Sequence, residues 1–175
     1  MRFKMFLFVT VMLTAGCAAV DVNTYQGEQP ELKLEEYFNG TLEAWGMFQE
    51  RGGKVAARFK VAIDARWEGD RGVLDERFVY SDGSTQQRVW QLIKTGEDTY
   101  TGRADDVVGI AQGRVSGNSL HWTYTLKLPV GDNFYEVQFD DWMYLQHDGV
   151  MINRSVMKKF GIRLGEVTLF FKKRS

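Results

Sequence analysis

Most of this chain alternates apolar and polar side chains with a period of two. The pattern is clearest in residues 58–67 (RFKVAIDARW) and 120–128 (LHWTYTLKL). Successive side chains of a β-strand point to opposite faces, so this period predicts strands with one apolar face each. No helical stretch separates the strands, and parallel strands would need such crossover helices. The pattern therefore predicts an antiparallel meander.

Glycine-containing turn signals divide this region into about ten strands. We predict an all-β fold, an antiparallel up-and-down β-barrel of about 8–10 strands, because closure removes the exposed edges of a sheet. An open or flattened sheet is the alternative. The expected strands are residues 42–50, 54–68, 71–81, 85–95, 98–103, 105–116, 119–129, 133–146, 150–160 and 163–172.

The N-terminus has the layout of a bacterial lipoprotein signal. Arg2 and Lys4 precede an apolar run over residues 5–13, and Cys17, the only cysteine, follows a small-residue stretch. The run is too short to cross a bilayer, which takes about 20 residues. We expect a signal peptide at residues 1–16 and a Cys17 that carries diacylglycerol and a fatty acid such as palmitate. Ala18 follows the cysteine, which favours the periplasmic face of the outer membrane.

The remaining chain divides into a tether and one domain. Residues 17–30 are expected to be the lipidated cysteine and a flexible polar tether, and residues 31–175 a single barrel domain that starts with a short helix over 31–38. The 22 Lys and Arg nearly balance 23 Asp and Glu, which argues against a nucleic-acid partner. We expect a monomer whose membrane contact is the lipid anchor.

The turn at Gly117-Asn118 sets the register of one hairpin. A two-residue turn places Gly113 opposite Trp122, Ala111 opposite Tyr124 and Gly109 opposite Leu126. Two interpretations remain open. Trp122 and Tyr124 fill the space over the small residues, or they line a groove left open for a ligand.

A second hairpin places two charges on otherwise apolar faces. With an even-length loop centred on His147-Asp148, Asp141 stands opposite Arg154. We predict an inward Asp141–Arg154 ion pair, since an unpaired buried charge costs several kcal/mol. The pair is either structural or a ligand site in which Arg154 binds an anionic head group, such as a fatty-acid carboxylate.

Glu76 and Arg88 form a comparable candidate pair on a neighbouring hairpin, where the loop at 81–84 leaves the register open. Catalytic motifs are absent from the sequence: there is no nucleophile elbow, phosphate loop or HExxH helix. Adjacent aspartates at 105–106 and 140–141 would point to opposite faces of a strand. We therefore predict no catalytic residue, no metal ligand and no cofactor.

Several short motifs, taken in order, resemble an uncharacterised proteobacterial lipoprotein family, domain of unknown function 3833. The resemblance covers about residues 30–173 and implies a lipocalin-like barrel. It assigns no catalytic residues. The motifs are residues 34–40 (LEEYFNG), 80–83 (YSDG), 140–143 (DDWM), 153–155 (NRS) and 159–161 (KFG).

These observations together predict a membrane-anchored outer-membrane lipoprotein that binds or shields a small apolar or amphipathic ligand, such as a fatty acid. Two alternatives stay open. One is an enzyme acting on a lipid intermediate, with Asp141 and Arg154 as polar groups in an apolar cavity. The other is a structural lipoprotein whose barrel is packed solid. The volume of the barrel interior distinguishes them.

Overall fold

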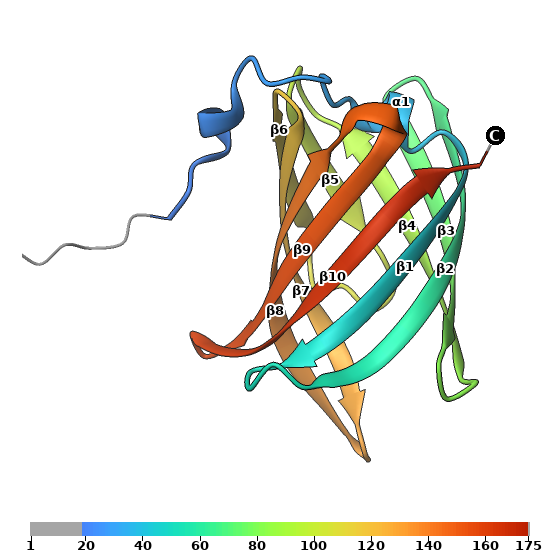
Figure 1. Cartoon of the computed structure of the whole chain (residues 1–175), viewed down its shortest axis with the longest axis vertical. Coiled ribbons are helices and arrows are strands. Elements are labelled where there is room, and N and C mark those ends of the chain that lie inside the picture. The colour runs from blue at the N-terminus through green and yellow to red at the C-terminus, as the bar shows by residue number, and fades with distance from the viewer. Residues whose placement is uncertain (1–18, 175) are drawn as a thin grey trace, which may run out of the picture.

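The alternating strands close into a ten-stranded antiparallel barrel in the computed structural model, which describes residues 19–174 (Figure 1). Each strand pairs with its neighbours in sequence, and β1 pairs with β10 to complete the barrel. The predicted all-β up-and-down barrel is confirmed. The strands are β1 Gly40–Glu50, β2 Val55–Glu68, β3 Arg71–Tyr80, β4 Thr85–Lys94, β5 Thr99–Arg103, β6 Ala111–Ser116, β7 Ser119–Val130, β8 Asn133–Leu145, β9 Val150–Lys159 and β10 Ile162–Lys173.

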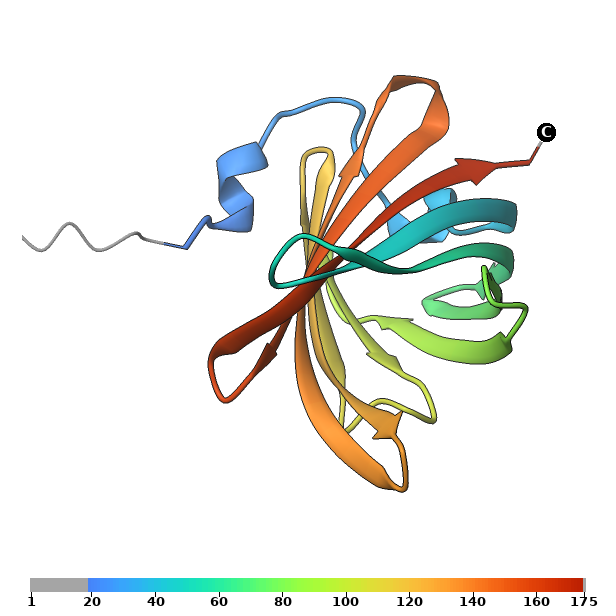
Figure 2. The ribbon, with the colours of Figure 1, turned by 60° about the horizontal axis from the view of Figure 1, so that its bottom comes forward.

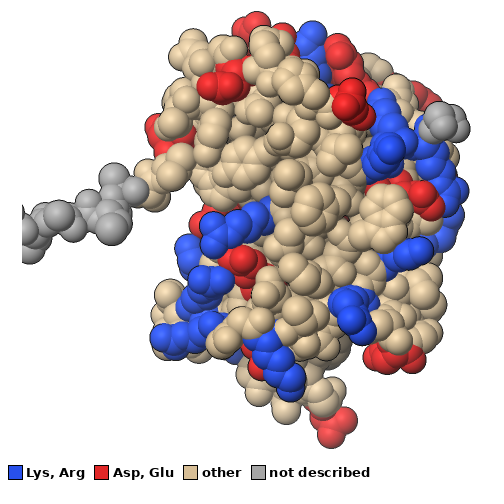
Figure 3. Space-filling view, viewed as in Figure 1, with Lys and Arg blue, Asp and Glu red and all other residues tan. Residues whose placement is uncertain are grey.

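The interior of the barrel holds the alternate apolar side chains of each strand, as in the series Val61, Ile63 and Ala65 of β2. Charged side chains of both signs lie on the face of the barrel that Figure 3 shows. The chain thus separates its two sets of side chains by strand geometry alone.

A single helical turn, α1 (Leu34–Tyr37), covers one end of the barrel (Figure 1). Leu34 and Phe38 are buried beneath it, and the Tyr37 hydroxyl donates to the carbonyl of Gly149 at 3.1 Å. The predicted helix over 31–38 is shorter than expected, because Leu32 is buried in extended backbone and its N–H donates to the Gly117 carbonyl.

The opposite end has no helix over it, and we call it the uncapped end. The loops at 51–54, 81–84, 131–132 and 160–161 lie there. Figure 2 brings this end forward and shows the hairpins β7–β8 and β9–β10 projecting separately.

Part of the expected tether packs against the barrel instead. A 3₁₀ turn, η1 (Val22–Tyr25), buries Val22 and places the Tyr25 ring 5.4 Å from that of Tyr144. The prediction of a flexible segment is therefore wrong from residue 22 onward. The sequence could not reveal this docking, since isolated apolar residues in a polar stretch show no period. Cys17 lies outside the described residues.

Trp122 fills the space above a glycine, as one interpretation of the first hairpin predicted. The pairing of Gly113 with Trp122 is confirmed, and the indole lies so close that a Cβ on Gly113 would overlap it. The register fails further on, because β6 begins at Ala111. Gly109 has a φ of 75° within a loop, and Leu126 pairs with Val107 instead.

Substituting Gly113→Ala is expected to lower the free energy of unfolding by about 1–3 kcal/mol, because the indole must shift in a packed interior. Gly52→Ala is the matched control, since a Cβ there meets no atom within 4 Å. Urea denaturation followed by tryptophan fluorescence measures both. Equal stability of the two variants would show that Trp122 does not pack tightly on Gly113.

Candidate functional site

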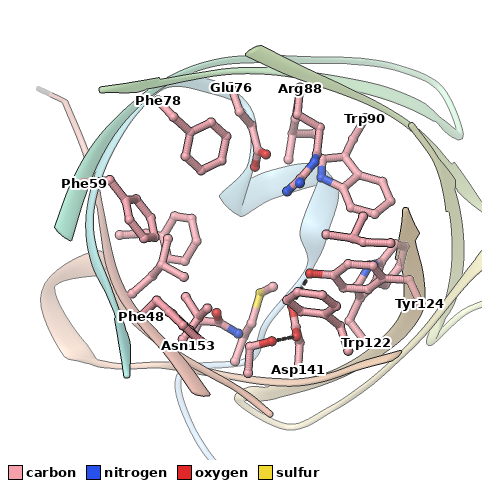
Figure 4. A pocket seen from close by; sticks show the side chains of 18 of the residues that line it. Phe48, Phe59, Glu76, Phe78, Arg88, Trp90, Trp122, Tyr124, Asp141 and Asn153 are labelled. Carbon is pink, nitrogen blue, oxygen red and sulfur yellow. Dashed lines mark hydrogen bonds between the residues drawn. The ribbon is translucent and has the colours of Figure 1, made fainter. Parts of the chain in front are cut away.

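The barrel encloses a cavity of about 340 Å³, so its interior is not packed solid (Figure 4). This volume falls within the range of roughly 300–1,000 Å³ found for small-molecule pockets. The lining is mainly apolar, and aromatic rings form much of it. These are Phe48, Phe59, Phe78, Tyr80, Trp90, Trp122, Tyr124 and Phe139.

Two carboxyl groups and a guanidinium interrupt this apolar lining. Glu76 on β3 and Arg88 on β4 are directly opposed in the strand register, as expected, but Arg88 forms its ion pair with Asp106 and not with Glu76. Both point into the cavity from one side, while Asp141 on β8 faces it from the other (Figure 4). The phenylalanines occupy the remaining wall. The cavity is thus amphipathic, with polar groups on two facing sides and a wall of phenylalanines beside them (Figure 4).

Arg88 is held in place by Asp106, which lies in the loop between β5 and β6. The guanidinium Nε is 2.9 Å from Oδ2 of Asp106, and Nη2 is 2.7 Å from the same oxygen. Both side chains are largely buried, at 14% and 27% exposure. Burial opposes the charge of Arg88, but the hydrogen bonds to Asp106 and the charge of Glu76 outweigh it and raise the pKa of Arg88. Arg88 therefore stays charged.

Asp106 was not among the predicted site residues. The sequence predicts only that Asp105 and Asp106 lie side by side on a strand over 105–116. The structure instead places Asp106 in a loop. The backbone carbonyl of Asp106 accepts a hydrogen bond from the N–H of Lys127 at 2.8 Å, which holds this loop against β7. Alternation carries no information about such a loop, so no signal in the sequence could have paired Asp106 with Arg88.

Glu76 lies in the cavity wall close to this ion pair. Burial raises the pKa of Glu76 from 4.5 to about 7, against the opposing positive charge of Arg88. Near neutral pH, the Glu76 carboxyl is therefore divided between its protonated and ionised forms. It can donate a hydrogen bond in one form and accept in the other.

Asp141 is buried and hydrogen-bonded within the barrel. It accepts from the hydroxyl of Ser155 and from that of Tyr124, the latter at 3.2 Å. Burial nevertheless raises the pKa of Asp141 from 3.8 to about 7. Burial also raises the pKa of Tyr124 well above 10, so its phenol remains a donor, and its ring stacks on Phe139 with centroids 5.0 Å apart.

Arg154 lies outside the barrel, and the predicted inward Asp141–Arg154 ion pair is wrong. Asp141 is opposed by Ser155, one residue further along β9 than expected. Arg154 pairs with Glu166 on the outer face, with Nη2 2.8 Å from Oε2. Its side chain is 59% exposed, so it cannot receive a ligand in the cavity.

The error comes from the loop between β8 and β9. Gln146 still pairs with Val150, to whose carbonyl its N–H donates at 2.7 Å, so three residues, 147–149, make the turn. They include Asp148 and Gly149 at φ of 63° and 71°. An odd loop shifts the register by one residue, which exchanges the two faces of β9. The residues that face inward are Ser155 and its neighbour Asn153, both buried and both missed, because their polar side chains resembled an outer face.

Within residues 19–174, no three His, Cys, Asp or Glu side chains cluster in a way that could hold a metal ion. In the same range, no helix has the length and apolar character needed to cross a membrane.

Comparisons with known proteins relate the chain to a family and to a fold. A family model described as "Protein of unknown function (DUF3833)" matches residues 11–173. The fold is similar to the S-type phycobiliprotein lyase CPES from Guillardia theta, with a TM-score of 0.56 and 8% sequence identity. This match covers 82% of the present chain and 94% of the lyase chain. The barrel is thus lipocalin-like. No curated protein sequence matches the chain.

Proposed function

This chain belongs to the DUF3833 family, and we propose that its barrel binds one small amphipathic lipid, with a fatty acid as the first candidate. The observation that carries the proposal is the apolar cavity with the charged Arg88 aimed into it (Figure 4). A lipocalin-like barrel of this size has room for one such ligand.

The head group of a fatty acid would lie at Arg88. Asp106 occupies Nε and Nη2 of the guanidinium, whereas Nη1 has no hydrogen-bond acceptor among the described residues. A ligand carboxylate can accept from Nη1 and from the protonated form of Glu76. The acyl chain would then lie against the phenylalanine wall, for example Phe59 and Phe78. Arg88 thereby takes the role that the sequence assigned to Arg154.

The location of the protein is part of the same proposal. Lipidation of Cys17 after removal of residues 1–16 would anchor the barrel to the outer membrane on its periplasmic face. Cys17→Ser is expected to move the protein from the membrane fraction to the soluble fraction of its host. A variant that stays in the membrane fraction would contradict anchoring through Cys17.

Arg88→Met is expected to weaken palmitate binding by roughly 10- to 100-fold, since charge-assisted hydrogen bonds to the carboxylate are lost. Quenching of the cavity tryptophans measures the affinity. Arg88→Met leaves Asp106 unpaired and can fail to fold for that reason. The double variant Arg88→Met with Asp106→Leu removes this unpaired charge and allows the same binding measurement. Arg154→Met is the control and should bind palmitate as the parent does, because Arg154 lies outside.

Native mass spectrometry of the protein purified from its own host provides an independent test. A bound lipid beyond the Cys17 acyl chains is the expected result. If no lipid is recovered and Arg88→Met binds palmitate as tightly as Arg154→Met does, the barrel is not a fatty-acid carrier.

A second candidate is an enzyme that acts on a lipid intermediate. The observation that favours it is a pKa of about 7 for both Glu76 and Asp141 in one cavity. Carboxyl groups with such pKa values can exchange protons with a substrate near neutral pH. The test is whether the protein converts a lipid substrate chemically. An activity that both Glu76→Gln and Asp141→Asn abolish, while each variant still binds the lipid, would favour the enzyme.

A further inference from the structure

The uncapped end carries a group of exposed apolar side chains on the hairpins β7–β8 and β9–β10. Phe160 is 89% exposed and Phe134 is 63% exposed. We call this group the tip patch. It consists of Val130, Phe134, Tyr135, Phe160, Ile162 and Leu164. Isolated exposed apolar residues need no explanation, but a group on projecting hairpins marks an interaction surface.

Phe160 stands at a backbone position that does not suit it. The β9–β10 turn has Phe160 at a φ of 50° and Gly161 at a φ of 76°. Two-residue turns with positive φ at both positions favour Asn-Gly, because a bulky side chain is strained there. The ring is also not buried, so neither folding nor packing accounts for it.

Two lysines lie over the rings of the tip patch. Residues 157–164 (MKKFGIRL) contain three Lys or Arg and no acid. The Nζ of Lys159 lies 3.8 Å from the ring centre of Tyr135 and 5.4 Å from that of Phe160, and the Nζ of Lys127 lies 4.8 Å from that of Phe134. Figure 3 shows Lys and Arg gathered toward the β9–β10 hairpin. Arg163 is paired with Glu166 and Lys158 with Asp140, so Lys159 and Lys127 are the cations that lie over the rings.

We propose that the tip patch inserts into the head-group region of an anionic lipid bilayer, with the uncapped end of the barrel facing the lipid. Aromatic rings suit the boundary between water and acyl chains, and lysines bind anionic head groups while their stems stay in apolar surroundings. The proposal stands independently of the ligand in the cavity.

The test compares binding of variants to vesicles made from equal parts of phosphatidylcholine and phosphatidylglycerol. The full-length chain carries Cys17→Ser, so that no acyl chain on this residue contributes. Phe160→Asn together with Phe134→Ser is expected to reduce co-sedimentation by roughly tenfold or more, since two exposed rings lose their burial in lipid. Vesicles of phosphatidylcholine alone should bind the parent more weakly than the mixed vesicles.

The control is Ile93→Ser, an exposed apolar residue on the outer face of β4. It should bind vesicles as the parent does. Phe160→Asn alone should keep or raise the melting temperature, because asparagine accepts the left-handed backbone, so a loss of binding cannot be ascribed to unfolding. Vesicle binding unchanged in the double variant overturns the proposal. The proposal is also overturned if the parent does not bind vesicles but forms a dimer in sedimentation velocity that Phe160→Asn abolishes.

Discussion

Asp106→Ala is expected to lower the free energy of unfolding by about 3 kcal/mol, because it leaves Arg88 charged and unpaired in a largely buried position. Asp106 provides both oxygens of that ion pair, and Arg88 has no ordinary means of losing its proton. Urea denaturation at neutral pH measures the effect. The same variant is expected to bind palmitate more tightly than the parent, since the ligand carboxylate then replaces the missing aspartate.

Asp105→Ala is the matched control for this prediction. It removes the same charge from the neighbouring residue, whose side chain is exposed. Surface substitutions of this kind usually change stability by less than about 0.5 kcal/mol. If the two variants are equally stable, the Arg88–Asp106 contact does not hold the site. If Asp106→Ala is unstable but gains no affinity for palmitate, Arg88 does not bind the ligand.

The contribution of Glu76 and Asp141 to the free energy of unfolding of the ligand-free protein is expected to fall as the pH rises from about 4 to about 7. Glu76 and Asp141 have folded-state pKa values of about 7, above their ordinary values of 4.5 and 3.8. In this window the folded protein binds more protons than the unfolded chain, so raising the pH favours unfolding. The stabilisation that comes from these two protonated carboxyls is fully present below about pH 4 and is lost by about pH 7. Each carboxyl contributes on the order of 2 kcal/mol to it.

Glu76→Gln and Asp141→Asn are each expected to flatten this pH dependence and to be more stable than the parent at pH 8. Glu97→Gln removes an exposed carboxyl from a turn and serves as the control. Urea denaturation of the four proteins at a series of pH values provides the comparison. A parent that becomes more stable from pH 5 to pH 7 would show that these carboxyls are not desolvated in the cavity.

Most of the fold could be predicted because alternation is a local property. Nine of the ten expected strands agree with the structure to within about two residues, a deviation common at the ends of such elements. The exception is the strand expected over 105–116, where β6 starts only at Ala111. There the chain leaves the sheet, and the loop that results positions Asp106 against Arg88.

The sequence identified the charged residues that interrupt apolar faces, but it left their partners open. Glu76 and Arg88 are candidates because each stands on an otherwise apolar strand face, and the structure then supplied the register that opposes them. In β9 both faces carry apolar residues, with Ile152 and Val156 outside and Met151 inside. The choice between faces then depended on loop length alone. An odd loop selected Ser155, and not Arg154, as the partner of Asp141.

The sequence by itself determined an antiparallel meander and favoured its closure into a barrel, because side chains that alternate along each strand must be sorted between an interior and a solvent face. It also determined that Asp141 and Glu76 belong to apolar faces. Only the tertiary structure decided which charge meets them, since that depends on a loop conformation at 147–149 and on a loop between β5 and β6. Alternation along one strand determines only which face each side chain takes, whereas the cavity and its ion pair are formed by residues from different strands and loops.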